Sequence, residues 1–177
     1  DHLHVLENSG ARAVIVSDDK LAKPLLPGVL AAGQAGFVIG IEPLRIAQAS
    51  NFEYHDWSAL IAGDGAKALA AVEARIARIG RQDTACLIYT SGTGGAPRGV
   101  MQHHGALLMN ADGAARVLAE DFGLDDDDAF LSFLPLSHAY EHTGGQMLPI
   151  GMGGQIFYSE GLEKLASNIE EVCPTIM

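Results

Sequence analysis

The chain has 177 residues, of which 48% are hydrophobic and 19% charged, and its formal net charge is −11. This composition excludes an intrinsically disordered chain, and the acidic balance argues against nucleic acid or an anionic membrane surface as the main partner. The negative net charge is compatible with a polyanionic small ligand, because one local cluster of donors can hold phosphate inside an acidic protein. The two cysteines are too few for a disulfide framework. No apolar run reaches the roughly 20 residues that a bilayer-spanning helix needs.

Short β-branched runs alternate with helical patterns along the chain. Residues 2–9 are typical of the end of a helix. Apolar segments bounded by Gly, Pro or Asp predict strands at 13–17, 36–42, 85–90, 129–134 and 155–158. Apolar residues at helical spacing predict helices at 64–79, 104–119 and 161–173. This alternation predicts a three-layer α/β fold, with a mainly parallel sheet and helices on both faces.

The ends of the sequence predict interrupted elements. The first residues resemble the tail of a helix, and the last four, Pro-Thr-Ile-Met, resemble the start of a strand. We therefore expect residues 1–177 to be a fragment that is truncated at both ends.

Segment 89–100 carries the strongest functional signal: Tyr-Thr-Ser-Gly-Thr-Gly-Gly-Ala-Pro-Arg-Gly-Val. It follows an apolar strand and precedes a predicted helix, which is where open parallel sheets bind ligands. Its three Ser/Thr hydroxyls and four glycines can present side-chain and main-chain donors to one anion. Arg98 adds a permanent cation with a planar fork that suits phosphate oxygens. The segment is not a Walker A motif, because Arg98-Gly99 stands where that motif needs Lys and Ser/Thr. It predicts a site for the phosphates of a nucleotide.

This segment resembles the signature loop of the adenylate-forming superfamily, which comprises acyl-CoA synthetases, luciferases and adenylation domains. That loop reads Tyr-Thr-Ser-Gly-Thr-Thr/Ser-Gly-x-Pro-Lys-Gly-Val. Segment 133–142, Phe-Leu-Pro-Leu-Ser-His-Ala-Tyr-Glu-His, is similar to the superfamily's Leu-Pro-Leu-x-His motif in its long-chain fatty acyl form. Segments 158–160, 163–165 and 174–175 also resemble the long-chain ligases. Three positions depart from the pattern: Gly94 replaces Thr/Ser, Arg98 replaces Lys, and His142 replaces Arg.

The resemblance implies that the chain is part of the N-terminal AMP-binding domain of a long-chain fatty acid:CoA ligase, without the C-terminal domain. In the whole protein a fatty carboxylate would attack the α-phosphate of Mg-ATP, and the thiol of coenzyme A would then displace AMP. The phosphate-binding residues that the resemblance implies are Thr90, Ser91, Gly92, Thr93, Gly94, Gly95 and Arg98. Of these, Arg98 is the expected catalytic residue and Thr90 the expected Mg²⁺ contact. His138 and Tyr140 are expected beside the acyl tunnel and the adenylate.

The resemblance also implies ATP, Mg²⁺ and coenzyme A as cofactors or co-substrates, and small molecules as partners. Nucleic acid and a transmembrane span are not expected. The expected location is the cytoplasm, and peripheral membrane contact and self-association stay open. The family's later motifs, which include a ribose-binding Asp and a C-terminal catalytic Lys, have no counterpart in the sequence. We therefore expect the chain alone not to complete catalysis.

Other functions remain as alternatives. Segment 138–142, His-Ala-Tyr-Glu-His, satisfies the inverted zinc-peptidase pattern H-x-x-E-H, in which two histidines on one helix face hold zinc and Glu141 acts as base. Segment 63–68 fits a loose G-x-G-x-x-A dinucleotide pattern, although Asp64 is explained as a helix cap. A non-catalytic nucleotide-binding module is a third alternative. The acidic run 125–128 is interpreted as a solvated turn, and His2, His4 and His55 as scattered surface histidines.

Overall fold

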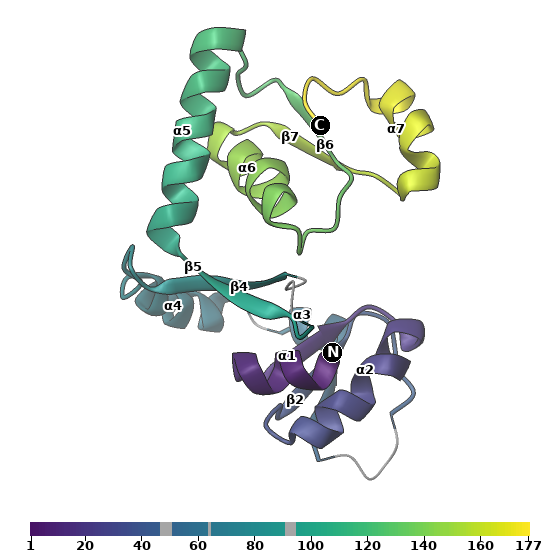
Figure 1. Ribbon diagram of the computed structural model, residues 1–177. Helices are drawn as coiled ribbons and strands as arrows, with labels where there is room; N and C mark the ends of the chain where they lie inside the picture. Colours follow the sequence, from purple (N-terminus) through teal and green to yellow (C-terminus); the bar gives the residue numbers. More distant parts are fainter. Residues whose placement is uncertain (47–50, 64, 91–94) are drawn as a thin grey trace. The chain divides into compact units, whose positions relative to one another are not determined.

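The computed structural model describes residues 1–46, 51–63, 65–90 and 95–177. The chain divides into two compact units (Figure 1). Unit 1 comprises Asp1–Ile79 and Tyr89–Gly99, and unit 2 comprises Gly80–Ile88 and Val100–Met177. The strands of the described residues lie in three sheets, one of three strands and two of two strands.

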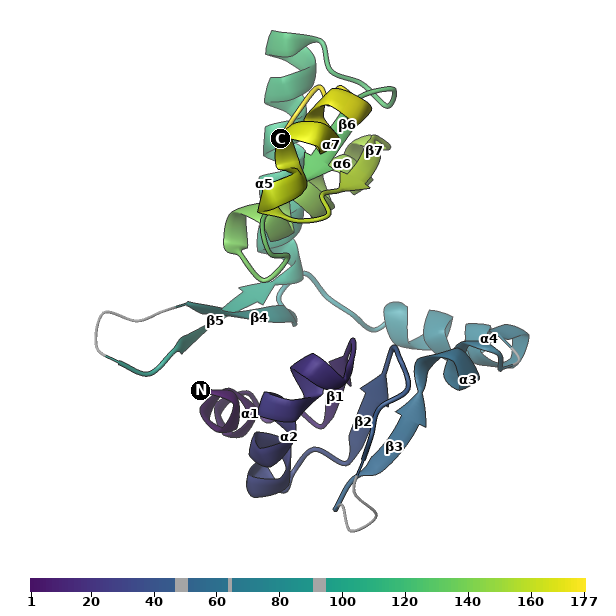
Figure 2. The same cartoon turned by 90° about the vertical axis from the view of Figure 1, so that its right-hand side faces the viewer.

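Unit 1 is built on a parallel sheet of β1, β2 and β3. Its elements are α1 (His2–Ser9), β1 (Ala13–Val16), α2 (Asp19–Ala32), β2 (Phe37–Gly40), β3 (Glu53–Asp56), α3 (Trp57–Ile61) and α4 (Gly65–Ile76). Ala13 pairs with Phe37, and Phe37 pairs in turn with Glu53. Helices α1 and α2 pack against each other and lie beside this sheet (Figure 2). The buried core consists of Leu6, Val16, Ala22, Val29, Ala35, Val38 and Phe52.

Helix α2 is fixed at both ends and in its middle. The Asp18 carboxylate accepts a hydrogen bond from the Leu21 main-chain N–H at 2.9 Å, which caps the start of the helix. Gly33 ends the helix in the left-handed conformation, with φ of 66°. Val29 of α2 and Val38 of β2 are both completely buried. Their burial joins the helix to the sheet and supplies much of the apolar area that stabilises unit 1.

Tyr54 of β3 links the sheet to the segment that follows β2. Its hydroxyl accepts a hydrogen bond from the Leu44 N–H at 3.0 Å and donates one to the Asp56 carboxylate at 2.6 Å. Gly40 leaves the space for this hydroxyl, because a Cβ at position 40 would lie 2.9 Å from it and 2.6 Å from the Glu42 carbonyl oxygen. Burial of the hydroxyl, followed by its hydrogen bond to Asp56, raises the pKa of Tyr54.

The raised pKa of Tyr54 predicts a loss of stability in alkali. The folded chain holds the Tyr54 hydroxyl proton more tightly than the unfolded chain does. The contribution of this proton to the free energy of unfolding is therefore complete below the ordinary tyrosine pKa of about 10, and it is lost as the pH rises through the pKa of Tyr54 in the folded chain. We expect the free energy of unfolding of unit 1 to fall above about pH 10, and to fall less in Tyr54→Phe. Urea unfolding between pH 8 and 11, followed by Trp57 fluorescence, measures this. Tyr158→Phe in unit 2 is the control, and an equally steep fall in Tyr54→Phe would contradict the prediction.

Unit 2 contains a parallel strand pair and a long helix that packs against neighbouring helical segments. Its elements are α5 (His104–Phe122), β6 (Ala129–Ser132), the π-helix η1 (Glu141–Met147), α6 (Leu148–Met152), β7 (Gln155–Tyr158), the 3-10 helix η2 (Leu162–Lys164) and α7 (Leu165–Val172). Ala129 of β6 pairs with Gln155 of β7, and α5 packs against η1 and α6 (Figure 1). Phe130, Leu131 and Leu148 are buried in this unit.

The boundary between the two units falls within the strands of a third sheet. This sheet pairs β4 (Thr84–Thr90) with β5 (Arg98–His103). Strand β5 leads directly into α5, where the His103 side chain accepts a hydrogen bond from the Ala106 N–H at 3.0 Å and so caps the helix.

The predicted α/β class with parallel pairing is confirmed. Every predicted strand and helix has a counterpart, although the strands are divided among three sheets. The expectation that the loop leads directly into a helix is wrong, because strand β5 comes first and pairs with β4.

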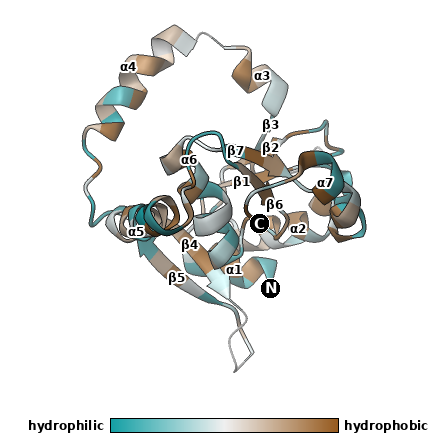
Figure 3. Ribbon diagram, turned by 90° about the horizontal axis from the view of Figure 1, so that it is seen from above, coloured by the Kyte–Doolittle hydropathy of each residue, from teal (hydrophilic) through white to brown (hydrophobic). Residues whose placement is uncertain are grey.

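Helix α4 is the predicted amphipathic helix, but its apolar face does not pack. Leu69, Val72 and Ile76 are all exposed. Hydrophobic and hydrophilic segments alternate along this helix in Figure 3. Within the described residues, no helix combines the length and the apolar character needed to cross a bilayer.

Candidate functional site

Strands β4 and β5 carry the two ends of the predicted phosphate loop. Thr90 is the last residue of β4 and Arg98 the first residue of β5, and both are exposed. Gly95 has φ of 113°, a conformation that strains any residue with a Cβ, so glycine is required there. Of the predicted phosphate-binding residues, Ser91, Gly92, Thr93 and Gly94 lie outside the described residues. The described ones, Thr90, Gly95 and Arg98, all belong to unit 1.

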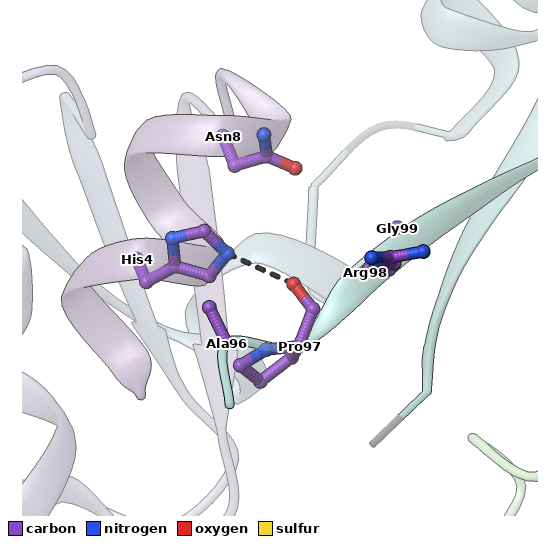
Figure 4. A pocket seen from close by; sticks show the side chains of 6 residues that line it. All are labelled: His4, Asn8, Ala96, Pro97, Arg98 and Gly99. Atoms are coloured by element: carbon purple, nitrogen blue, oxygen red, sulfur yellow. Dashed lines mark hydrogen bonds between the residues drawn. The ribbon is translucent and has the colours of Figure 1, made fainter. Parts of the chain in front are cut away.

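Arg98 is an exposed cation that borders a cavity. In the described part of the chain, no carboxylate lies within ion-pair distance of its guanidinium. It borders a cavity of about 430 Å³ whose other lining residues are His4, Asn8, Ala96, Pro97 and Gly99 (Figure 4). A guanidinium that is free of acidic neighbours keeps all its donors for an incoming anion.

Helix α1 contacts both ends of the loop. The His4 ring donates from Nε2 to the Pro97 carbonyl oxygen at 2.9 Å (Figure 4). The Tyr89 hydroxyl donates to the Asn8 side-chain oxygen at 2.8 Å. A Cβ at Gly99 would lie 2.9 Å from Cζ of Tyr89, so the tyrosine ring rests against the main chain of β5. The interpretation of His4 as a scattered surface histidine is therefore wrong, since its ring is half-buried and bonded.

Tyr140 lines an apolar cavity in unit 2. The cavity measures about 580 Å³ and lies between α5 and the η1–α6 segment. Its lining residues are Asn110, Gly113, Ala114, Val117, Leu118, Tyr140, Thr143, Gly144, Leu148 and Ile176. His138 is exposed and is not among them; its Nδ1 accepts a hydrogen bond from the Tyr140 N–H at 3.2 Å. His138 therefore caps the start of the helical segment that carries Tyr140.

The residues of the zinc-peptidase pattern do not converge. The helical segment begins at Ala139, after His138, and Glu141 is buried with 2% of its surface exposed. Among the described residues, the only group of three or more potential metal ligands within reach of one another is Asp125, Asp126 and Asp127. These three are exposed. They lie in a turn closed by hydrogen bonds from main-chain N–H groups to the Asp125 and Asp128 carboxylates, as the sequence predicts.

The dinucleotide pattern at 63–68 lacks its required context. Asp64 lies outside the described residues. Helix α3, rather than a strand, precedes the pattern, whereas a dinucleotide-binding glycine turn joins a strand to a helix.

The whole chain, residues 1–177, matches the sequence model of the family described as "AMP-binding enzyme". The chain belongs to this family. The chain is 39% identical over 95 residues to long chain acyl-CoA synthetase 7, peroxisomal, of Arabidopsis thaliana, a match that covers 54% of the chain and 13% of that protein. It is 33% identical over 95 residues to long-chain-fatty-acid–CoA ligase 6 of Homo sapiens, covering 53% and 14%. Over 174 residues it is 29% identical to naringenin synthase of Pestalotiopsis fici, covering 96% and 6%.

Solved structures share the fold of this chain. An anthranilate CoA ligase in complex with anthranoyl-AMP matches with a TM-score of 0.66 and 18% identity, over 98% of this chain and 32% of that one. A long-chain-fatty-acid-CoA ligase from Archaeoglobus fulgidus matches with a TM-score of 0.60 and 23% identity, over 98% and 30%. The chain thus spans about a third of these enzymes or less.

Proposed function

We propose that the protein carrying this chain activates a long-chain fatty acid with ATP, forming acyl-AMP and then acyl-CoA. Membership of the AMP-binding family and similarity to acyl-CoA ligases support this reaction class. The single observation that carries the proposal is the Arg98 guanidinium, which has no ion-pair partner in the described part of the chain and lies at the end of a loop whose Gly95 requires glycine. Residues 1–177 would supply part of the N-terminal domain, and further segments would complete the active site.

In the first step, a carboxylate oxygen of the fatty acid bonds to the α-phosphorus of ATP. The bond from that phosphorus to the oxygen bridging to the β-phosphate breaks, and pyrophosphate leaves with the electron pair. We propose that Arg98 neutralises the charge that develops on this leaving group, in the geometry of a fixed electrostatic donor. Ser91, Gly92, Thr93, Gly94 and Gly95 would hold the β- and γ-phosphates through hydroxyl and main-chain N–H donors.

Thr90 is the residue proposed to contact Mg²⁺. Its hydroxyl offers the hard oxygen ligand that this ion prefers, and its side chain is exposed at the end of β4. When bound, Mg²⁺ supplies additional positive charge to the phosphates. In the second step, the coenzyme A sulfur attacks the acyl carbonyl carbon and AMP departs with the electrons of the broken acyl–oxygen bond.

The apolar cavity beside Tyr140 supports a fatty acyl substrate. Small residues such as Gly113, Ala114 and Gly144 leave space there, and Val117, Leu118 and Leu148 make its walls apolar. An aliphatic chain gains about 0.8 kcal/mol for each methylene that such a cavity removes from water. We propose that Tyr140 contacts the acyl group, with His138 near the adenylate. The proposed location is the cytoplasm, with peripheral access to membranes that contain the fatty acid.

ATP–pyrophosphate exchange tests the proposal. The assay uses the whole protein that carries this chain, with Mg²⁺ and palmitate, and the 177-residue chain in parallel. We expect palmitate-dependent exchange in the whole protein and none in the chain alone. Acetate and anthranilate, tested in place of palmitate, identify the class of acid that the protein activates. Faster exchange with anthranilate than with palmitate would show that the substrate is an aromatic acid and not a fatty acid. Absence of exchange with all three acids would overturn the ligase assignment.

A further inference from the structure

We infer that helix α1 positions the two strand ends that flank the phosphate loop, which His4 and Asn8 hold through Pro97 and Tyr89. The inference rests on the proposed function, because it assigns these residues to the binding of ATP phosphates. Neither side chain needs to touch the nucleotide. Both act through the main chain and Tyr89, so they are positioning residues.

His4 holds the far end of the loop. Its Nε2 donates to the Pro97 carbonyl oxygen at 2.9 Å, across 93 residues of sequence. Pro97 immediately precedes Arg98, so this bond fixes the main chain that carries the cation (Figure 4). The ring is half-buried, which shields the hydrogen bond from competing water.

Asn8 holds the near end of the loop. Its side-chain oxygen accepts the Tyr89 hydroxyl at 2.8 Å, and Tyr89 immediately precedes Thr90. The ring of Tyr89 also lies against Gly99, where any Cβ would come within 2.9 Å of Cζ. Tyr89 is therefore held by α1 on one side and by the first residues of β5 on the other.

Helix α1 is itself anchored to the core of unit 1. His4 and Asn8 are four residues apart and so lie on the same face of the helix, while Leu6 is buried in the core with 5% of its surface exposed. Gly28 allows α2 to approach closely, since a Cβ there would lie 3.1 Å from the Leu3 nitrogen. The two anchors thus connect the loop ends to packed secondary structure. Holding a binding group in place before the ligand arrives lowers the entropy lost on binding.

The anchors make a specific kinetic prediction for the whole protein. We expect His4→Ala and Asn8→Ala each to raise the KM for MgATP about three- to tenfold, the effect of losing one hydrogen bond. The KM for palmitate and the melting temperature should stay close to the wild-type values. His4→Gln retains a side-chain N–H donor and Asn8→Asp retains an oxygen acceptor, so both should recover part of the loss. His2→Ala, an exposed histidine on the same helix, is the matched control.

Hydrogen exchange provides a readout that does not depend on activity. In the whole protein, the Thr90, Arg98 and Gly99 amides should exchange at least about threefold faster in His4→Ala and Asn8→Ala than in wild type. If the wild-type protein is active and both variants keep its KM for MgATP, the inference is overturned. Unchanged hydrogen exchange at these amides would also overturn it. If the wild-type protein is inactive but hydrogen exchange is faster in the variants, the proposed function is overturned, whereas the anchoring of the two strand ends by helix α1 is established.

Discussion

Replacement of Arg98 with alanine is expected to lower kcat/KM for ATP–pyrophosphate exchange in the whole protein about 100-fold, equivalent to about 2.7 kcal/mol of transition-state stabilisation. The guanidinium has no carboxylate partner in the described ranges, so its removal leaves no neighbouring acid to destabilise. The effect should therefore fall on catalysis, where charge gathers on the departing pyrophosphate. Exchange kinetics at saturating palmitate, with MgATP varied, measure it.

Two variants make the Arg98 result specific. Arg98→Lys restores the residue of the family's signature loop and keeps the charge, so it should retain most of the activity. Arg78→Ala removes an exposed arginine elsewhere in unit 1 and should behave as wild type. Wild-type exchange in Arg98→Ala, or an equal loss in Arg78→Ala, would show that the guanidinium of Arg98 has no particular role.

Phe130→Ala is expected to destabilise unit 2 by about 3–5 kcal/mol. Only 2% of the Phe130 surface is exposed. Phe130 pairs with Ile156 of β7 and forms a parallel bridge with Ile176. A Cβ at Gly154 would lie 2.9 Å from the ring, so main chain closes one side of the site and cannot easily collapse into the cavity. Urea unfolding followed by far-ultraviolet circular dichroism measures the loss.

Phe122→Ala is the matched control, because it makes the same substitution in unit 2 at a side chain that is 70% exposed. Its effect on the free energy of unfolding should stay within about 0.5 kcal/mol. The single tryptophan, Trp57, belongs to unit 1, so its fluorescence does not report on this core. Equal losses in the two variants would contradict the assignment of Phe130 to the core of unit 2.

The sequence predicts those strands that are rich in apolar and β-branched residues, and not those held only by their neighbours. Strand β1 reads Ala-Val-Ile-Val and is predicted, whereas β3 reads Glu-Tyr-His-Asp and pairs only because β2 offers it an edge. Helix α2 was missed because Pro24 and Pro27 lie inside it, and proline ordinarily ends a helix. The tertiary packing of α2 on the sheet outweighs that local cost.

The sequence likewise predicts one part of the candidate site and not the other. The loop is evident from its residue types, because hydroxyls, glycines and an arginine in one short segment have few other uses. The helix α1 anchors could not be found this way, because His4 and Asn8 bond to partners 93 and 81 residues distant. No spacing pattern encodes such contacts. The match to the zinc-peptidase pattern at 138–142 is a match of sequence only, because His138 lies outside the helix that the pattern requires.

The two α1 anchors should leave different traces in the evolution of the family. Asn8 bonds to a side-chain hydroxyl, so a relative that loses the hydroxyl at position 89 has no reason to keep an acceptor at position 8, and the two positions should covary. His4 bonds to a main-chain carbonyl, which every amino acid provides. Position 97 can therefore change its side chain without any compensating change at position 4, and a covariation search would detect only the first of the two anchors.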